Sequence, residues 1–145
     1  MSIYFEFKFK SNLDEVGLKK FFGQLYDLSF RISEDEKISK TVFVEKMKEF
    51  KNKIICLIDN KKINFFIGLR NGIIECSFRE YGIYDENVRG EVKRVLLQII
   101  DLLNAKSVSI SIDDGTKICD DLDVEIFKKR TLGYVLHIAD INSPV

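Results

Sequence analysis

The sequence has few of the residue types and motifs on which most catalytic and metal sites depend. It contains a single histidine, and its three cysteines show no CxxC spacing, so it does not supply the ligands typical of a structural zinc site. Glycine-rich phosphate-binding loops of the GxxxxGKS or GxGxxG kind are missing, and so is the GxSxG motif of a serine nucleophile. We therefore expect no metal, no cofactor and no enzymatic activity.

The cysteines are few and odd in number. Cys56 and Cys76 fall within predicted strands on the side that faces the core, and Cys119 stands apart from them. Free cysteine behaves as a small hydrophobic residue, and disulfides are rare in the cytoplasm. We expect buried, reduced thiols in a cytoplasmic protein. The single proline, together with heavy use of isoleucine and lysine, is typical of an AT-rich bacterial genome.

No long hydrophobic run is present. No apolar segment approaches the ~18 residues of a membrane-spanning helix, and Lys8 and Lys10 interrupt the aromatic start, so neither a membrane span nor a signal peptide is predicted. A hydrophobic content of 46% and a charged content of 32% are ordinary for a folded protein, and the 145 residues fit one domain, 1–145. The formal net charge of zero argues against general affinity for nucleic acid.

The stretch 53–79 organises the predicted fold. Apolar runs alternate there with polar turn residues, which predicts a three-stranded antiparallel meander. Asn71-Gly72 is a strong hairpin signal, because a type I′ turn needs positive φ at both central residues. With this turn, Leu69 lies opposite Ile74, and every residue of the predicted inner face is apolar. That inner face consists of Ile54, Cys56, Ile58, Phe65, Ile67, Leu69, Ile74, Cys76 and Phe78.

The other face of the meander carries an unexplained apolar group. A turn at Asn60-Lys61 is expected to join the first two strands, and it leaves Ile55, Leu57 and Phe66 together on an otherwise polar face. Exposed apolar side chains that gather in one place are typical of a binding surface. We expect that either a helix or a partner covers them.

The N-terminal part predicts a strand followed by a helix. Residues 3–10 alternate strictly between apolar and polar side chains, which is the pattern of a half-buried strand. Asn12 and Glu15 have the spacing of a capping box, and apolar residues then recur at helical spacing as far as Leu28. These signals predict a helix over 13–28 with one apolar stripe.

The segment after this helix gives a weaker signal. A short strand is expected near Ile32. Apolar residues from Phe43 to Phe50 recur at i, i+4 and i+7, which favours a short helix that ends near Asn52. Val42 lies beside them, and its β-branched side chain also suits a strand, so both interpretations stay open.

The clearest helix signal covers residues 86–103. Asp85 is a good N-cap, a broad apolar stripe follows, and Asn104 is a suitable left-handed stop. Alternation of serine with apolar residues then predicts a strand over 107–112, and Asp-Asp-Gly predicts a turn over 113–115.

The segment 120–130 admits two interpretations. Its first half alternates acidic and apolar residues as a strand does. Acids at its start and Lys128 to Arg130 at its end instead match the dipole of a helix that stops at Gly133, and we favour that helix. A closing strand is predicted over 133–138.

Together these elements predict a single α+β domain. It has one mostly antiparallel sheet with the three-stranded meander (about 53–79) at its centre. Two main helices, 13–28 and 86–103, pack on one face of that sheet.

Residues for a dispersed catalytic site are few. His137 is the only histidine, and it stands three residues before Asp140. A site assembled from these two with Tyr134 and Asp113 is the alternative in which the protein is a small enzyme. Such a site needs a deep pocket and a group with a perturbed pKa. We expect instead that His137 is an ordinary residue of the closing strand.

Charge is distributed unevenly along the chain even though the net charge is zero. Segment 37–62 holds eight lysines against three acids, a net charge of +5. Segment 113–125 holds six acids against one lysine, a net charge of −5. Such asymmetry is often the footprint of a partner, although solvated helices and turns produce it as well. The six acids are Asp113, Asp114, Asp120, Asp121, Asp123 and Glu125.

The sequence therefore favours a non-enzymatic, protein-binding module. An acidic segment is suited to block a basic active site, in the way that immunity proteins block nuclease toxins, and charge complementarity makes such association fast and specific. We expect a protein partner, a cognate toxin or another enzyme, with no membrane and no nucleic acid. The candidate binding residues are the six acids together with Ile55, Leu57 and Phe66. These last three alternatively form the interface of a homo-oligomer or of a structural complex.

Overall fold

The computed structural model of the protein describes residues 3–49 and 51–137, apart from the side chains of residues 81 and 82. In this part of the chain, seven strands form one antiparallel sheet in the order β2-β3-β4-β5-β1-β6-β7. The strands are β1 (Tyr4–Lys10), β2 (Arg31–Ile32), β3 (Lys51–Ile58), β4 (Lys61–Arg70), β5 (Ile73–Arg79), β6 (Ser107–Ile112) and β7 (Lys117–Asp123). The helices are α1 (Glu15–Asp27), α2 (Lys40–Met47), α3 (Glu80–Tyr84), α4 (Glu86–Leu103), α5 (Val124–Lys129) and α6 (Leu132–Val135).

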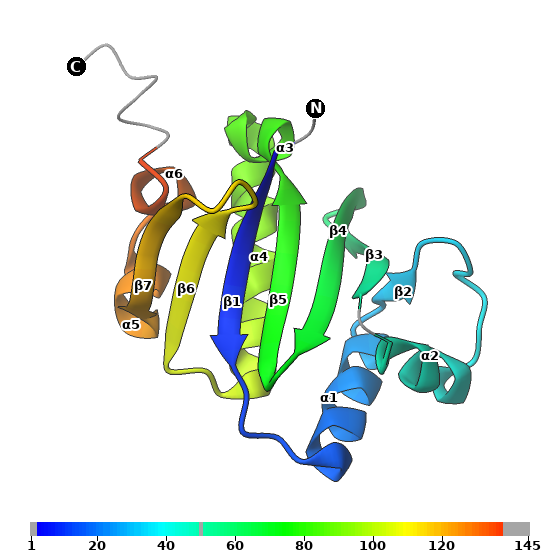
Figure 1. The fold of residues 1–145 in the computed structure, drawn as a ribbon. Helices are drawn as coiled ribbons and strands as arrows, with labels where there is room; N and C mark the ends of the chain where they lie inside the picture. The colour runs from blue at the N-terminus through cyan, green and yellow to red at the C-terminus, as the bar shows by residue number, and fades with distance from the viewer. Residues whose placement is uncertain (1–2, 50, 138–145) are drawn as a thin grey trace.

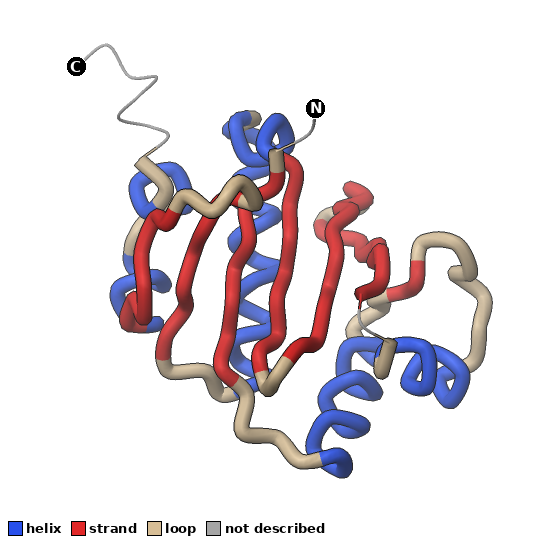
Figure 2. The backbone as a smooth tube through the Cα atoms, viewed as in Figure 1, coloured by secondary structure: helices blue, strands red, loops and turns tan. Residues whose placement is uncertain are grey.

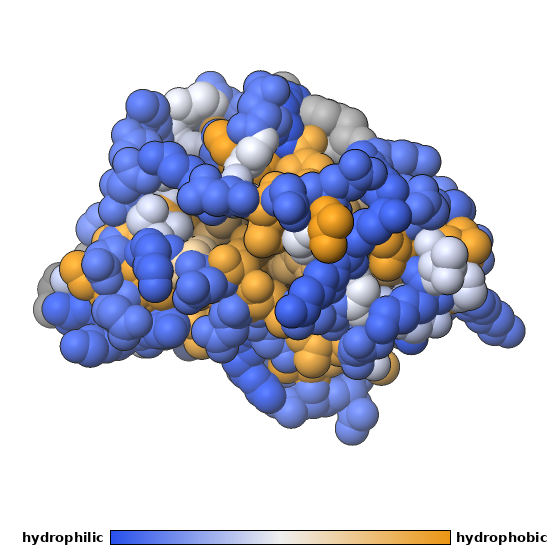
Figure 3. Space-filling view, turned by 90° about the horizontal axis from the view of Figure 1, so that it is seen from below, coloured by the Kyte–Doolittle hydropathy of each residue, from blue (hydrophilic) through white to orange (hydrophobic). Residues whose placement is uncertain are grey.

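The sheet and its helices form two layers. Helix α4 runs behind the central strands, and α1 and α2 lie together beside the β2–β3 end of the sheet (Figures 1 and 2). The apolar faces of these helices and one face of the sheet share a single hydrophobic core. Hydrophilic side chains cover most of the molecule when it is seen from below, and apolar ones gather at the centre of that view (Figure 3). The predicted α+β class, with its two longest helices packed on one face, is confirmed.

Strand β1 lies between β5 and β6 and has the alternation that its sequence predicts. Phe5, Phe7 and Phe9 are buried in the core, because period-two alternation sends every second side chain to the same face. Phe7 lies opposite Cys76 of β5 on one side and Ile110 of β6 on the other. The strand that comes first in the chain therefore joins the meander to the C-terminal hairpin.

Helix α1 begins two residues later than the predicted start at Leu13. Asp14, not Asn12, is the N-cap, and its Oδ1 accepts a hydrogen bond from the backbone N–H of Gly17 at 2.7 Å. The backbone N–H of Ser11 donates to the carbonyl of Gly72 at 2.7 Å, which ties the connection to the β4–β5 turn before the helix can start. The predicted capping box at Asn12 is therefore wrong.

The segment between α1 and the meander, for which the sequence gives only a weak prediction, contains the short strand β2 and the helix α2. Helix α2 ends at Met47, where the prediction placed the end near Asn52. Asn52 instead belongs to β3, is buried, and donates from Nδ2 to the carbonyl of Lys46 at 3.0 Å. Phe50, which contributed to the helix prediction, lies outside the described residues.

The second turn of the meander is confirmed. Asn71 and Gly72 have φ values of 51° and 76°, and Leu69 lies opposite Ile74 as predicted. The first turn differs from the prediction, because its central residues are Asp59 and Asn60, with φ values of 50° and 66°. Asp and Asn tolerate the left-handed region better than the lysine that the prediction placed there. The pairing moves by two residues, and a shift of two leaves every side chain on its predicted face.

Helix α4 begins and ends as predicted. The side chain of Asp85 accepts a hydrogen bond from the N–H of Asn87 at 2.9 Å, and Asn104 takes the left-handed conformation with φ 51°. The buried stripe faces the sheet, and its members are Val92, Val95, Leu96, Ile99 and Ile100.

The C-terminal part departs most from the prediction. Segment 120–130 is a strand up to Asp123 and a helix only from Val124, so each interpretation is right for part of it. The predicted strand over 133–138 is wrong for the described residues 133–137: Thr131 Oγ1 accepts from the N–H of Tyr134 at 3.1 Å and starts the short helix α6. Lys93 of α4 donates from Nζ to the carbonyl of Lys128 in α5, which holds this region against α4 instead of in the sheet. Residues 138–145 lie outside the described part.

Candidate binding surfaces of the sheet

The face of the sheet opposite α4 lies open to solvent. It carries the odd-numbered side chains of β3 and β5 and the even-numbered ones of β1 and β4, since parity fixes the face in each strand. Leu57 on this face is 54% exposed, so no described helix covers it. In Figure 1 the α4 helix stands wholly on the far side of the central strands.

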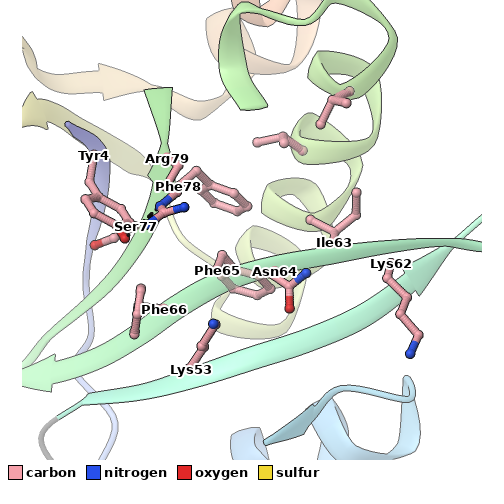
Figure 4. Close-up of a pocket in the computed structure, with 12 residues that line it drawn as sticks. Tyr4, Lys53, Lys62, Ile63, Asn64, Phe65, Phe66, Ser77, Phe78 and Arg79 are labelled. Carbon is pink, nitrogen blue, oxygen red and sulfur yellow. Dashed lines mark hydrogen bonds between the residues drawn. The ribbon is translucent and has the colours of Figure 1, made fainter. Parts of the chain in front are cut away.

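Strands β4 and β5 stop pairing halfway along this face. Their ladder runs from Arg70 and Ile73 at the turn to Phe66 and Ser77, and there it ends. Strand β4 continues on its β3 side to Lys61, and β5 continues on its β1 side to Arg79. The two strands thus separate while each keeps its other neighbour, which opens the sheet at this point (Figure 4).

A cleft of about 420 Å³ occupies the opening. Its base is apolar, with Phe65 and Phe78 from the strands and Val88 and Val92 from α4. This volume falls within the range of about 300–1,000 Å³ that is usual for small-molecule sites. The full lining is Tyr4, Lys53, Lys62, Ile63, Asn64, Phe65, Phe66, Ser77, Phe78, Arg79, Val88 and Val92.

Aromatic and cationic side chains surround the mouth of the cleft. Tyr4 and Phe66 meet edge to face with ring centroids 5.9 Å apart. Arg79 donates from Nε to the hydroxyl of Tyr4 at 3.1 Å, and its guanidinium lies 5.9 Å from the centre of that ring. Lys53 and Lys62 make no ion pair and no side-chain hydrogen bond with the residues that the structure describes. The twelve lining residues include three cations and no carboxylate.

A pair of glutamates lies on the same open face, one from β1 and one from β5. Burial, followed by the hydrogen bond and the charge repulsion between Glu6 and Glu75, raises the pKa of Glu6, while nearby Lys8 partly opposes the rise. Ser111 donates from Oγ to Glu6 at 3.5 Å, and Ser77 donates to Glu75 at 3.5 Å. This pair holds a proton more readily than an isolated carboxyl does, because two like charges at close range oppose ionisation.

The six predicted acids gather at the opposite edge of the sheet. Asp113 and Asp114 form the β6–β7 turn, Asp120 and Asp121 belong to the edge strand β7, and the last two lie at the start of α5. All six are exposed. The six acids that are close in sequence therefore also lie at one edge of the folded sheet.

Two of these acids stabilise local structure. Asp123 caps α5 by accepting from the N–H of Glu125 at 2.8 Å. Asp114 accepts from the N–H of Thr116 at 2.9 Å, and this hydrogen bond lowers the pKa of Asp114. Both interactions satisfy backbone donors that a turn or a helix start would otherwise leave open.

Three other acids form surface ion pairs with lysine. Asp121 lies 3.3 Å from Lys10 of β1, and Asp120 lies 3.3 Å from Lys117 within its own strand. Glu125 lies 3.7 Å from a lysine one turn along α5. Exposed pairs of this kind contribute only about 0–1 kcal/mol each, so solvent and partners compete for these acids easily.

The three predicted apolar residues share the open face but not one pocket. Ile55 pairs with Asn64, and Phe66 pairs with Lys53, so both are flanked by polar neighbours. Phe66 lines the cleft and is partly buried, with the ammonium of Lys51 4.8 Å from its ring centre. Ile55 and Leu57 lie outside the cleft lining.

The residues of the alternative catalytic site are placed on different elements. Tyr134 belongs to α6 and is 48% exposed, with the guanidinium of Arg130 4.7 Å from its ring centre. His137 follows α6 with a left-handed φ of 57°, so it is not the strand residue that the sequence predicts. Asp113 lies in the β6–β7 turn, and Asp140 lies outside the described residues. None of the three that the structure describes lines the cleft between β4 and β5.

Comparison with known proteins returns no similarity from which a function follows. No protein-family model matches the chain, and neither a curated protein nor a solved structure matches it. Among the described helices, none has the length and apolar character needed to cross a membrane. The cleft between β4 and β5 and the acidic edge at β7 are therefore the features from which a function is proposed.

The sequence does not predict the cleft, although it singles out one of the residues that line it. The sequence singles out Phe66 as an aromatic side chain on a polar face, and Tyr4 has the same property on β1. Aromatic residues at positions that alternation assigns to solvent are the signal that points to this face. The sequence does not show where β4 and β5 separate.

Proposed function

We propose that the protein is a non-enzymatic inhibitor of the immunity type, which binds a basic protein partner through the acidic edge formed by β7 and its flanking turns. One observation carries the proposal: six acids from 113 to 125 lie exposed at one edge of the sheet. A partner whose active site binds nucleic acid presents the opposite charge. A nuclease toxin is the class of partner that fits best.

The physical argument is electrostatic. Complementary surface charge steers association and raises its rate, and it discriminates against neutral or acidic competitors. Strand β7 is also the last strand in the order of the described sheet, where a row of acids disfavours pairing with a second sheet. The same acids therefore attract a basic partner and hinder the edge-to-edge pairing of two copies of the sheet.

The proposal is tested with variants that reverse charge without removing helix or turn caps. In the triple variant Asp113→Lys, Asp120→Lys and Glu125→Lys, the capping residues Asp114 and Asp123 stay in place. The chain is co-expressed with the products of its adjacent genes. Complexes are then purified, and their molar mass is measured by light scattering. We expect a 1:1 complex with a basic protein, and at least a hundredfold loss of affinity in the triple variant.

A control variant carries the same change of charge elsewhere. Glu15, Glu34 and Glu36 are exposed and lie on α1 and in the loop before α2. Their replacement by lysine should leave the complex intact. If the acidic-edge variant binds as well as the wild-type protein, the proposed surface is wrong.

Self-association is a second candidate function, and the exposure of Leu57 is the observation that favours it. An apolar side chain that is 54% exposed on an open sheet face suits an interface between copies. Light scattering at rising concentration tests this candidate. A dimer that Leu57→Asp abolishes supports it, and a monomer at every concentration excludes it.

A further inference from the structure

The cleft between β4 and β5 has features that the acidic edge does not explain. It lies across β1 and β6 from that edge in the strand order, and it has the opposite charge. Among the described residues that line it, Lys53, Lys62 and Arg79 are cationic, and none is a carboxylate. Concave surfaces of one charge concentrate the field and attract ligands of the opposite charge.

Nearby acids are engaged elsewhere, which preserves the positive character of the cleft. Asp59, in the turn between β3 and β4, bonds to Arg94 of α4. Glu91 lies 3.3 Å from Lys61, the neighbour of Lys62 in sequence. Two carboxylates of the neighbouring elements are thus engaged by other cations, and Lys53 and Lys62 have no acidic partner in the described structure. A bound anion would provide the negative charge that these two lysines lack.

Aromatic rings supply the second part of the site. Phe66 from β4 and Tyr4 from β1 meet edge to face at the mouth. Figure 4 shows the ring of Tyr4 beside Ser77 and Arg79. Ser77, which is 1% exposed, lies beneath the larger side chains around it. Aromatic faces and edges favour flat, conjugated groups. The apolar base below them, with Val88 and Val92, excludes water from such a group.

The size of the cleft and the charge of the whole chain favour a small molecule over a polymer. A volume of about 420 Å³ accommodates one ring system with an attached charged group. The protein has no net charge, and its other edge is acidic, so a long polyanion meets repulsion away from the cleft. A small anion experiences mainly the positive field of the cleft itself.

We propose that this cleft binds a small aromatic anion, a flat ring that carries a carboxylate, sulfonate or phosphate group. The ring lies over the apolar base, against the Phe66–Tyr4 pair, and the anionic group bonds to Lys53 and Lys62 at the mouth. Arg79 adds its charge and holds the hydroxyl of Tyr4 in place. The cations of the cleft lie on β3, β4 and β5, whereas the six acids lie on β7 and its flanking turns, so variants can change each surface separately.

The experiment is a titration followed by amide chemical shifts of the full-length protein. The probes are adenosine 5′-monophosphate, phenyl phosphate and 2-naphthalenesulfonate, and each is compared with a neutral ring (adenosine or 2-naphthylmethanol) and with inorganic phosphate. We expect shifts at Asn64, Phe66, Ser77 and Arg79 with the aromatic anions. Affinity should be at least tenfold weaker for neutral rings and for phosphate alone, and it should fall several-fold when salt is raised, because salt screens exposed charges.

Two pairs of variants separate the cleft from general electrostatics. Lys53→Glu with Lys62→Glu should weaken binding at least tenfold, whereas Lys19→Glu with Lys20→Glu on the exposed side of α1 makes the same change in net charge and should not. Phe66→Ala should weaken binding, and Leu57→Ala on the same face but outside the cleft should not. Unchanged dispersion of the amide spectrum shows that each variant is folded.

Three results overturn the proposal. The first is that none of the three aromatic anions shifts the cleft amides at millimolar concentration. The second is equal binding by neutral and anionic rings. The third is equal weakening by the cleft and control pairs of lysine variants. Loss of partner binding in the acidic-edge variant has no bearing on these results, so the two proposals fail separately.

Discussion

The rings of Phe65 and Phe78 stack with their centroids 4.8 Å apart and their planes 8° from parallel. They lie one step beyond Phe66 and Ser77, where the hydrogen-bonded ladder between β4 and β5 ends. Side-chain stacking thus holds the two strands together where the backbone does not, and it forms the base of the cleft. The separation of the strands above this stack is what gives the open face a pocket.

The first prediction concerns this stack. Phe65→Ala and Phe78→Ala should each lower the free energy of unfolding by about 3–5 kcal/mol, because both rings are buried. The double variant should lose less than the sum, with a coupling of about 0.5–1.5 kcal/mol for the lost ring contact. Denaturant unfolding of the four proteins measures this coupling, and strict additivity would contradict the finding that the rings support each other.

The second prediction uses two glycines with opposite expected effects. Gly72 has φ 76° in the β4–β5 turn, and a Cβ there would also meet the carbonyl of Ser11 at 3.4 Å. Gly72→Ala should therefore destabilise the protein by about 1–2 kcal/mol. Gly90 lies in α4, and a Cβ added to it would meet nothing within 4 Å, so Gly90→Ala should stabilise the protein by about 1 kcal/mol. Thermal or denaturant unfolding measures both changes, and a shared sign would refute this account.

The sequence predicted best those elements that local chemistry determines. The Asp85 cap, the apolar stripe and the Asn104 stop define α4 completely within the helix itself. The β4–β5 register follows from a two-residue turn and an uninterrupted apolar face. The β3–β4 pairing was wrong by two residues yet left both faces as predicted, because the side-chain period of a strand is two.

The errors arose where tertiary contacts decide between local preferences. Tyr134 and Leu136 alternate as a strand would, but the cap at Thr131 starts a helix, and the hydrogen bond from Lys93 holds the preceding helix α5 against α4. The cleft could not be predicted from the sequence for a different reason. Where two paired strands separate depends on the twist of the whole sheet and on the packing of α4, and residue patterns in β4 and β5 do not encode it.

The third prediction concerns pH. The pKa of Glu6 is raised in the folded protein by burial and by Glu75, with Asp113 acting in the same direction and Lys8 against it. The folded state therefore holds this proton more tightly than the unfolded chain, and its stability falls as pH rises above the ordinary carboxyl value of 4.5. Glu6→Gln should be more stable than the wild-type protein at pH 7, with the gain shrinking towards pH 4. Melting curves across this range test it, and a gain that grows in acid would show the reverse sign.

The fourth prediction separates structural acids from those free to bind a partner. Asp123→Ala removes the cap of α5 and should cost about 1 kcal/mol of stability. Asp120→Ala removes only an exposed pair with Lys117 and should cost less than about 0.5 kcal/mol. Asp123→Asn, which keeps a capping oxygen, should recover most of the stability. Equal losses at the two positions in denaturant unfolding would contradict the assignment of Asp123 as the cap.

The last prediction concerns the thiols. Burial raises the pKa of Cys56 to about 12, and burial together with Glu75 raises the pKa of Cys76 as well. The thiolate is the reactive form, so neither side chain should react in the folded protein near neutral pH. Burial also raises the pKa of Cys119 in the edge strand β7, but this thiol is only partly buried, so a reagent in solution can reach it.

Titration of the native protein with a thiol-specific disulfide reagent at pH 8 distinguishes the three thiols. We expect the reagent to modify one cysteine promptly and the other two only after denaturant is added, because access to Cys56 and Cys76 requires the core to open. Cys119→Ser should abolish the prompt reaction. Prompt modification of two or three thiols in the native state would mean that the core around Cys56 and Cys76 opens readily.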